Sequence, residues 1–316
     1  MLLINKLQTI VRMHKWTTKP KHHATLAALL LTALTGCNLE NELDVVLPTY
    51  PDELVVECYL EAGTVPRLTV LESGPYLPDV PDRPTITLPT AATPVLGVAL
   101  PSGQSVAVPT DVTASLTLPN GQAVALRFAP GIDPVTRKYF THVGTAPLAM
   151  QPGQRFALTV QDTRGRRVTG TAGVPTLVPI DSVRYGFNGL SGNDRRANFI
   201  TRWTDPAATT DYYRLLLNNG RDDINDSASD SPLEDRLFNG QSYTALTTYR
   251  FRPNDTLTAT LFHLEPEYYS FQQSIREAVR ATGNPFAQPA RIRNTVQGGL
   301  GVFAVLVADR RTLILR

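Results

Sequence analysis

Short apolar runs that alternate with polar positions recur along the chain beyond residue 50. In Arg155–Gln161, phenylalanine, leucine and valine occupy every second position, and the residues between them are small or polar. This period of two is typical of a half-buried β-strand. The dipeptide Asn120-Gly121 separates two similar runs, 114–118 and 123–128, and it predicts a hairpin turn because both residues tolerate positive φ. Further strands are predicted at 53–60, 67–72, 167–172, 182–187, 198–204, 212–218, 241–251, 256–263 and 299–308.

One segment, 265–282, has the period of a helix. Its apolar residues, among them Tyr268, Ile275 and Val279, recur on one face at steps that fit 3.6 residues per turn. Pro266 suits the first helical turn, where a missing N–H group costs nothing. We interpret the apolar stripe as packing on a sheet, with docking of a partner as the alternative.

Prolines divide the predicted strands into two groups. Pro175 and Pro179 stiffen the connection before a new set of strands begins. The predicted fold class is therefore all-β, with two tandem Ig-like or fibronectin-like β-sandwiches over 51–175 and 176–316, the second with one inserted α-helix. The first sandwich contains a proline-rich insertion, 73–112, whose length indicates either a functional loop or a disordered one.

The amino terminus has the pattern of a secretory signal. Residues 1–36 contain five basic side chains and no acidic one. Their apolar core, Ala24–Leu34, is about half as long as the roughly 20 residues that a transmembrane helix needs. Met13 is an alternative start to Met1, because the basic segment that follows Met13 is already sufficient for a signal.

Leu34-Thr35-Gly36 stand directly before Cys37 and resemble the bacterial lipobox. The resemblance implies a lipid on the Cys37 sulfur, cleavage before Cys37, acylation of the new amino group, and a lipidated tether over 37–50. Several acyl chains hold a protein at a membrane, whereas one chain binds only marginally. The alternative is an ordinary secretory signal followed by a chance cysteine.

Processing would also change the charge. The formal net charge of the whole chain is +2, and removal of the five basic residues of the signal would bring it to −3. This balance gives no argument for a nucleic-acid partner. The second of the two cysteines, Cys58, has no disulfide partner within the chain if Cys37 carries lipid. We interpret Cys58 as a buried core residue, with a reactive thiol as the alternative.

The chain lacks the common catalytic motifs. It contains no GxSxG elbow, no P-loop and no GxGxxG after a strand. Beyond the predicted signal, histidine occurs only at His142 and His263, in no metal-binding spacing. A hydrolase stays an alternative, because a serine triad or a pair of carboxylates is defined by its geometry in space. The sequence predicts no enzyme, no catalytic residues, no metal and no cofactor other than the covalent lipid.

The acidic segment 221–236 partly matches a calcium-binding loop. Ala228 stands where that template requires glycine, and Pro232 interrupts the loop. We therefore interpret the segment as a solvated loop and keep calcium as a weak alternative. Four side chains fall at template positions one, three, five and twelve: Asp223, Asn225, Ser227 and Glu234.

Several short motifs follow one another in a fixed order along the predicted mature chain. They are Leu54–Leu60, Val65–Val70, Val178–Val183, Asp211–Leu215, Leu237–Gly240, Tyr268–Phe271, Asn284–Phe286 and Gly298–Phe303. Together they resemble a family of Bacteroidetes outer-membrane lipoproteins that share a domain of unknown function. In the last motif, glycines can bend a strand or let another backbone approach closely, including the edge of a partner.

The resemblance implies an outer-membrane lipoprotein of the kind often encoded beside a TonB-dependent receptor. We expect an accessory or ligand-binding partner of such a β-barrel, with a small molecule, glycan or peptide as ligand. The alternative is a structural or adhesive surface lipoprotein whose Ig-like domains act as spacers. The acidic segment Asn38–Glu42 resembles surface-export signals, so the cell surface is favoured over the periplasmic face.

Overall fold

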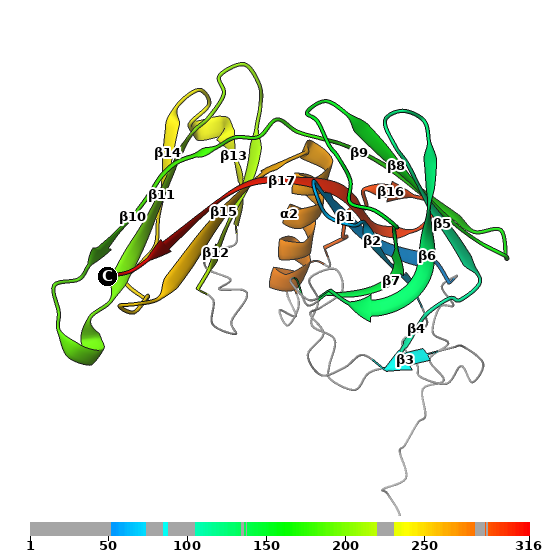
Figure 1. Ribbon diagram of the computed structural model, residues 1–316, viewed down its shortest axis with the longest axis horizontal. Coiled ribbons are helices and arrows are strands. Elements are labelled where there is room, and N and C mark those ends of the chain that lie inside the picture. Colours follow the sequence, from blue (N-terminus) through cyan, green and yellow to red (C-terminus); the bar gives the residue numbers. More distant parts are fainter. Residues whose placement is uncertain are drawn as a thin grey trace, which may run out of the picture. The chain divides into compact units, whose positions relative to one another are not determined.

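The computed structural model describes residues 52–73, 85–87, 105–133, 136, 138–219, 231–281, 288 and 290–316. These residues form β-strands and one α-helix, which confirms the predicted all-β class with an inserted helix (Figure 1). No helix in this part of the chain is long and apolar enough to cross a membrane.

The strands of the first half are mostly short. They are β1 (Leu54–Glu61), β2 (Arg67–Glu72), β3 (Thr85–Thr87), β4 (Ser105–Ala107), β5 (Val112–Thr117), β6 (Ala123–Ile132), β7 (Tyr139–Val143), β8 (Arg155–Asp162) and β9 (Arg167–Gly173). Of these, β1, β2, β5, β6, β8 and β9 lie where the sequence predicts strands. Within the predicted insertion 73–112, β3 and β4 pair with each other.

The second half contains the helix and two short 3₁₀ turns. Its elements are β10 (Ile180–Phe187), η1 (Gly192–Asp194), β11 (Ala197–Thr204), β12 (Tyr212–Asn218), β13 (Ser231–Glu234), η2 (Asp235–Leu237), β14 (Ser242–Leu246), β15 (Thr256–Leu264), α2 (Pro266–Ala281), β16 (Val296–Gln297) and β17 (Leu300–Ile314). The sequence did not predict β3, β4, β7, β13 or β16. The strand expected over 241–251 ends at Leu246 as β14.

The longest strand, β17, connects the strands of the two halves. The larger sheet has the order β13-β12-β15-β17-β1-β2-β7-β6-β5-β8-β9-β16, and a smaller sheet has the order β10-β11-β14. β17 first pairs in parallel with β1, with Val56 opposite Gly301, and then pairs antiparallel with β15, with Phe262 opposite Ala308. The division into domains 51–175 and 176–316 stays a prediction, and β17 contributes to the strand pairing of both ranges.

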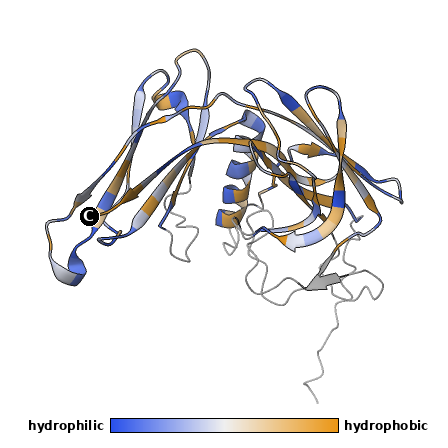
Figure 2. Ribbon diagram, in the orientation of Figure 1, coloured by the Kyte–Doolittle hydropathy of each residue, from blue (hydrophilic) through white to orange (hydrophobic). Residues whose placement is uncertain are grey.

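Alternating burial builds a separate apolar cluster in each half. The first contains the fully buried side chains of Leu116 and Leu158, and the second those of Trp203 and Phe199. Figure 2 shows apolar residues along the strands of both halves. Burial of this apolar area is the main favourable contribution to folding.

The helix α2 packs on the larger sheet, as its apolar stripe predicts. Tyr268 and Phe271 are buried against Val302 and Ala304 of β17. Tyr268 also packs edge-on against Tyr59 of β1, with 5.7 Å between the ring centroids. Figure 2 shows the mixed polarity of α2 that this one-sided burial requires.

The glycines at the start of β17 allow a close approach of other strands. Gly298 and Gly301 have φ values of +79° and +123°. A Cβ atom at Gly298 would collide with the carbonyl oxygen of Arg167, and one at Gly301 with that of Val56. The interpretation of this motif as a place of close backbone approach is therefore confirmed, and both approaching backbones belong to this chain.

Candidate functional site

The predicted lipid-attachment site lies outside the described residues. This holds for Cys37 and for the lipobox residues Leu34, Thr35 and Gly36. Lipid attachment at Cys37 stays a prediction.

Three buried carboxylates meet at one end of the second apolar cluster. Asp205 follows β11, Asp211 precedes β12, and Asp235 begins η2. Their exposed fractions are 3%, 5% and 1%, and one oxygen of each lies within 4.8 Å of one oxygen of each of the others. We call these residues the aspartate cluster.

Hydrogen bonds from the chain itself hold Asp205 and Asp235. The Tyr213 hydroxyl donates to Asp205 Oδ1 at 2.5 Å, and the Gly240 N–H donates to Asp205 Oδ2 at 2.8 Å. The Asp211 N–H donates to Asp235 Oδ2 at 2.8 Å, and the Asp235 N–H donates to the Asp211 carbonyl oxygen at 3.1 Å. Two hydrogen bonds between Asp211 and Asp235 thus join the loop that follows β11 to the turn η2.

His263 extends the network to β15 and to the segment between the two halves. Its Nε2 lies 2.8 Å from Asp211 Oδ1, and its Nδ1 lies 2.5 Å from the carbonyl oxygen of Thr176. A carbonyl and a carboxylate only accept hydrogen bonds. The Nδ1 of His263 therefore donates to the Thr176 carbonyl oxygen. Thr209 Oγ1 donates to the other Asp211 oxygen at 2.7 Å.

Burial disfavours the negatively charged forms of Asp235 and Tyr213. Burial raises the pKa of Asp235 above its ordinary value, and the nearby charges of Asp205 and Asp211 raise it further. Burial and the hydrogen bond to Asp205 likewise raise the pKa of Tyr213 far above the ordinary range. The phenol of Tyr213 therefore stays protonated and acts as a donor, and Asp235 keeps its proton to a higher pH than an ordinary aspartate does.

The hydrogen bonds that the carboxylate oxygens already make argue against metal binding by the aspartate cluster. Carboxylate oxygens are ligands that Ca²⁺ and Mg²⁺ prefer. However, both oxygens of Asp205 and both oxygens of Asp211 already take part in hydrogen bonds within the chain. We therefore interpret the cluster as a structural network that fixes the loops at this end of the fold. No spacing in the sequence indicates it, although the motifs Asp211–Leu215 and Leu237–Gly240 both border it.

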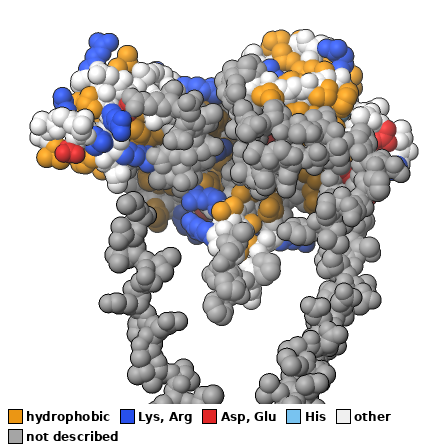
Figure 3. All heavy atoms as spheres, turned by 90° about the horizontal axis from the view of Figure 1, so that it is seen from below, with side chains coloured by type: hydrophobic (Ala, Val, Ile, Leu, Met, Phe, Trp, Pro, Cys, Tyr) orange, Lys and Arg blue, Asp and Glu red, His pale blue; other side chains and the backbone are white. Residues whose placement is uncertain are grey.

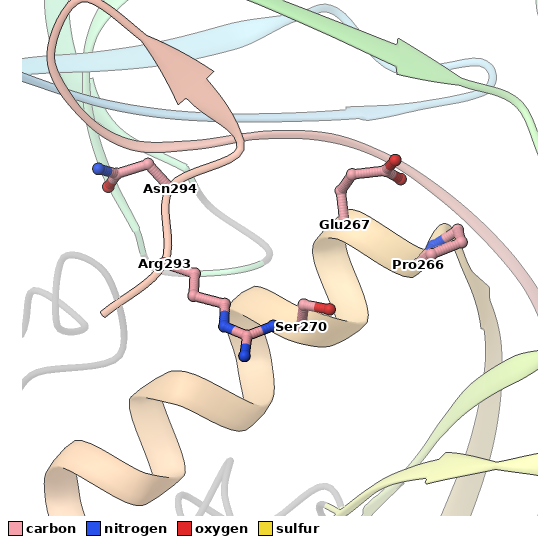
Figure 4. A pocket seen from close by; sticks show the side chains of 5 residues that line it. All are labelled: Pro266, Glu267, Ser270, Arg293 and Asn294. Carbon is pink, nitrogen blue, oxygen red and sulfur yellow. The ribbon is translucent and has the colours of Figure 1, made fainter. Parts of the chain in front are cut away.

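A second candidate is an open cavity of about 260 Å³ at the first turns of α2. Figure 4 shows its lining, with the Arg293 guanidinium beside Ser270 and Glu267 nearer the start of the helix. The backbone N–H of Arg293 donates to Ser274 Oγ at 2.9 Å, and this bond connects the segment that contains Arg293 to α2. A helix N-terminus favours an anion, but the carboxylate of Glu267 already lies in this turn. Its lining includes Ser270 and Glu267, but no hydrogen bond joins these two side chains, so they are not arranged as a nucleophile and its base.

The remaining sequence candidates lie apart from both places. Of the calcium-loop residues, Asp223, Asn225 and Ser227 lie outside the described residues, and Glu234 pairs with Arg236 at 3.0 Å. Cys58 is fully buried, and burial followed by the charge of neighbouring Glu57 raises its pKa to about 12. The thiol of Cys58 is therefore a core group, as the sequence indicates.

The fold and these sites define an all-β protein with one helix packed on its larger sheet. The model of the family described as a domain of unknown function, DUF4249, matches residues 40–312. The chain therefore belongs to this family, which confirms the resemblance to a domain of unknown function.

Two further comparisons add no functional information. A search of the curated proteins found no match. Among solved structures, a pullulanase complexed with maltotriose from Anoxybacillus sp. LM18-11 is similar at 13% identity, with a TM-score of 0.18. The alignment covers 66% of this chain and 24% of the pullulanase chain, so the chain spans about a quarter of that protein.

Proposed function

We propose that this protein is a non-enzymatic outer-membrane lipoprotein that acts as an accessory or ligand-binding partner of a TonB-dependent receptor. The observation that carries the proposal is Cys37, which follows Leu34-Thr35-Gly36 at the end of a basic and apolar signal pattern. A thioether-linked lipid requires a thiol, and the peptidase that removes the signal requires small residues beside that cysteine. DUF4249 is described only as a domain of unknown function, and membership of this family conflicts with no part of the proposal.

The non-enzymatic role is supported by the surroundings of the two histidines. His263 contacts an aspartate and a backbone carbonyl, and His142 contacts Thr141 Oγ1 at 2.8 Å inside the first half. Neither arrangement is a nucleophile with its base in an accessible cleft. The carboxylates of the aspartate cluster are buried, so a glycan could not reach them without opening the fold.

A lipid anchor would increase the frequency with which this protein meets a partner in the same membrane. A lipid and the tether 37–50 keep the strands at the membrane, which raises the effective concentration toward a weak partner to about the millimolar range. Loops on a rigid scaffold usually carry recognition. We propose that the loops of this protein contact the receptor or its small-molecule, glycan or peptide ligand.

Metabolic labelling tests the anchor. Cells that express the full chain are grown with radioactive palmitate, and the protein is isolated from outer membranes. We expect label in the wild type and none in Cys37→Ala, which should leave the membrane fraction. Cys58→Ala is the matched control, because that thiol is buried in the core, and it should keep the label. Equal labelling of wild type and Cys37→Ala would contradict the anchor.

Recovery of partners tests the accessory role. The natively expressed, tagged protein is crosslinked mildly in outer membranes and isolated, and the proteins that accompany it are identified by mass spectrometry. One TonB-dependent barrel in near-stoichiometric amount is the expected result. Recovery of labelled protein without any specific barrel would contradict the accessory role and favour a structural or adhesive lipoprotein. Removal of 73–112 should lower recovery if that insertion makes the contact.

A further inference from the structure

Two loops and the last residues of the described chain form one end of the second half. Loop 188–196 joins β10 to β11, and loop 247–255 joins β14 to β15. The Ala197 N–H donates to the Phe251 carbonyl oxygen at 2.8 Å, and the Asn254 N–H donates to the Leu315 carbonyl oxygen at 2.6 Å. These bonds hold the loops side by side, so their side chains present one surface.

Arginine dominates this surface. It carries Arg195, Arg196, Arg250 and Arg252, which we call the arginine end. Among the described residues, Arg195 and Arg252 take part in no ion pair, although arginines elsewhere in the chain do so. The Arg195 guanidinium lies 3.9 Å from the centroid of the Phe187 ring, a contact that orients the cation without neutralising it.

Few carboxylates among the described residues oppose Arg195 and Arg252. Asp194 lies in the same loop, and Asp255 is only 5% exposed, with Oδ2 accepting the Arg252 N–H at 2.8 Å. Figure 3 shows Lys and Arg side chains over the second half on the face seen from below, with few Asp and Glu side chains among them. The surface therefore attracts anions.

Exposed apolar side chains stand among the arginines. Leu190 is 57% exposed and Tyr249 is 52% exposed, one in each loop. Figure 3 shows hydrophobic side chains interspersed with the basic ones on this part of the face. Arginine forms paired hydrogen bonds with phosphate, and tyrosine prefers the interface between lipid and water. The combination matches a phosphate-bearing lipid surface.

The exposure of the apolar residues also favours lipid over an acidic protein. Energetic anchors at protein interfaces are large side chains that fill packed pockets, whereas this surface offers one exposed leucine and one exposed tyrosine, Leu190 and Tyr249. A fluid headgroup layer accepts such single side chains. The chain between the predicted anchor at Cys37 and Asp52, the first described residue, can span about 50 Å when extended. A tether of this length allows the described strands to take more than one orientation at the bilayer.

We propose that the arginine end, together with Leu190 and Tyr249, is a second, peripheral membrane contact that binds the phosphate of lipid headgroups with a net negative charge. The inference rests on the proposed function only in that the lipid anchor supplies the bilayer. Contact at this end would restrict the orientation of the protein relative to the membrane and thereby fix which loops face a receptor.

Vesicle sedimentation with the unlipidated chain 38–316 tests the contact without the anchor. This chain includes the whole compact unit Tyr50–Arg316. The vesicles contain phosphatidylcholine alone or an equimolar mixture with phosphatidylglycerol. We expect binding to the mixture only, and loss of binding at about 1 M salt, where charges are screened beyond roughly 3 Å.

Matched variants identify the surface. Each arginine near an anionic membrane strengthens binding about fivefold, so Arg195→Gln/Arg252→Gln should weaken binding at least about tenfold. The control Arg127→Gln/Arg167→Gln removes the same charge from exposed positions of the first half and should bind like the wild type. Leu190→Ser/Tyr249→Ser should also weaken binding. Far-UV circular dichroism must be unchanged for every variant that is scored.

The outcomes separate the inference from its competitors. Equal losses in the two arginine pairs would assign binding to overall charge and overturn the inference. The inference also fails if no form binds the mixed vesicles, or if the wild type binds polyglutamate beads and not vesicles, which would indicate an acidic protein. Because the assay contains no lipidated Cys37, these failures leave the palmitate test of the proposed function unaffected.

Discussion

The substitution Gly301→Ala tests the pairing of β1 with β17, which no local sequence pattern specifies. Gly301 has a φ of +123°, a conformation that residues with a Cβ atom rarely adopt. It lies opposite Val56 in the parallel ladder, and an added Cβ would meet the Val56 carbonyl oxygen. Backbone cannot move aside as the end of a flexible side chain can, so the two strands would have to separate.

The expected cost has two parts. Backbone strain at such a φ is about 1–3 kcal/mol. Separation of the strands weakens ladder hydrogen bonds, which contribute about 0.5–1.5 kcal/mol each, at a place where Val56 is fully buried. We expect Gly301→Ala to lower the free energy of unfolding by about 3–5 kcal/mol, near the upper limit for single substitutions.

Urea unfolding followed by far-UV circular dichroism measures the difference. Gly121→Ala is the matched control, because Gly121 also has a positive φ, +83°, but no atom lies within 4 Å of the added Cβ. That variant should lose only about 1 kcal/mol, the cost of a left-handed alanine. If Gly301→Ala is no less stable than Gly121→Ala, the two strands do not approach closely at Gly301 and the reasoning is refuted.

Three further predictions concern buried polar groups. Because the folded-state pKa of Asp235 is raised, its ionisation destabilises the fold as pH rises through that pKa. Urea titrations should therefore find Asp235→Asn more stable than wild type at neutral pH, with the advantage gone below the ordinary pKa of 3.8. Tyr213→Phe removes the donor to Asp205 Oδ1 and should cost about 1–3 kcal/mol; an unchanged midpoint would contradict that bond. A thiol reagent should modify Cys58 only after unfolding, since its pKa is raised to about 12, and rapid native-state labelling would contradict its burial.

Elements with strong local signals could be predicted from the sequence. The alternation of Arg155–Asp162 places Phe156 and Leu158 in the core, where both are buried in β8. The Asn120-Gly121 dipeptide forms the expected turn, in which the Leu118 N–H donates to the Gln122 carbonyl oxygen at 2.8 Å. In each case the residues that determine the conformation are neighbours in the chain.

Elements that depend on distant partners could not be predicted. The strand β13 contains Pro232, and proline interrupts a strand pattern. The structure accommodates it because β13 is the edge strand beside β12. The aspartate cluster was missed for a similar reason, since Asp205 and Asp235 are brought together only by the pairing of distant strands. The spacing of the three aspartates along the chain therefore does not indicate that they form a cluster.

The role of β17 leads to a prediction about cooperativity. Its two parts belong to the pairing of β1 and of β15, so loss of one half should remove the support of the other. Leu158→Ala in the first half should cost about 2–5 kcal/mol. Trp203, the one tryptophan beyond the predicted signal, is fully buried in the second half and reports on that half alone. If the halves unfold together, Leu158→Ala shifts the Trp203 fluorescence transition as far as the circular dichroism transition. A fluorescence midpoint equal to that of the wild type would instead make 51–175 and 176–316 independent domains, with β17 separable at its middle.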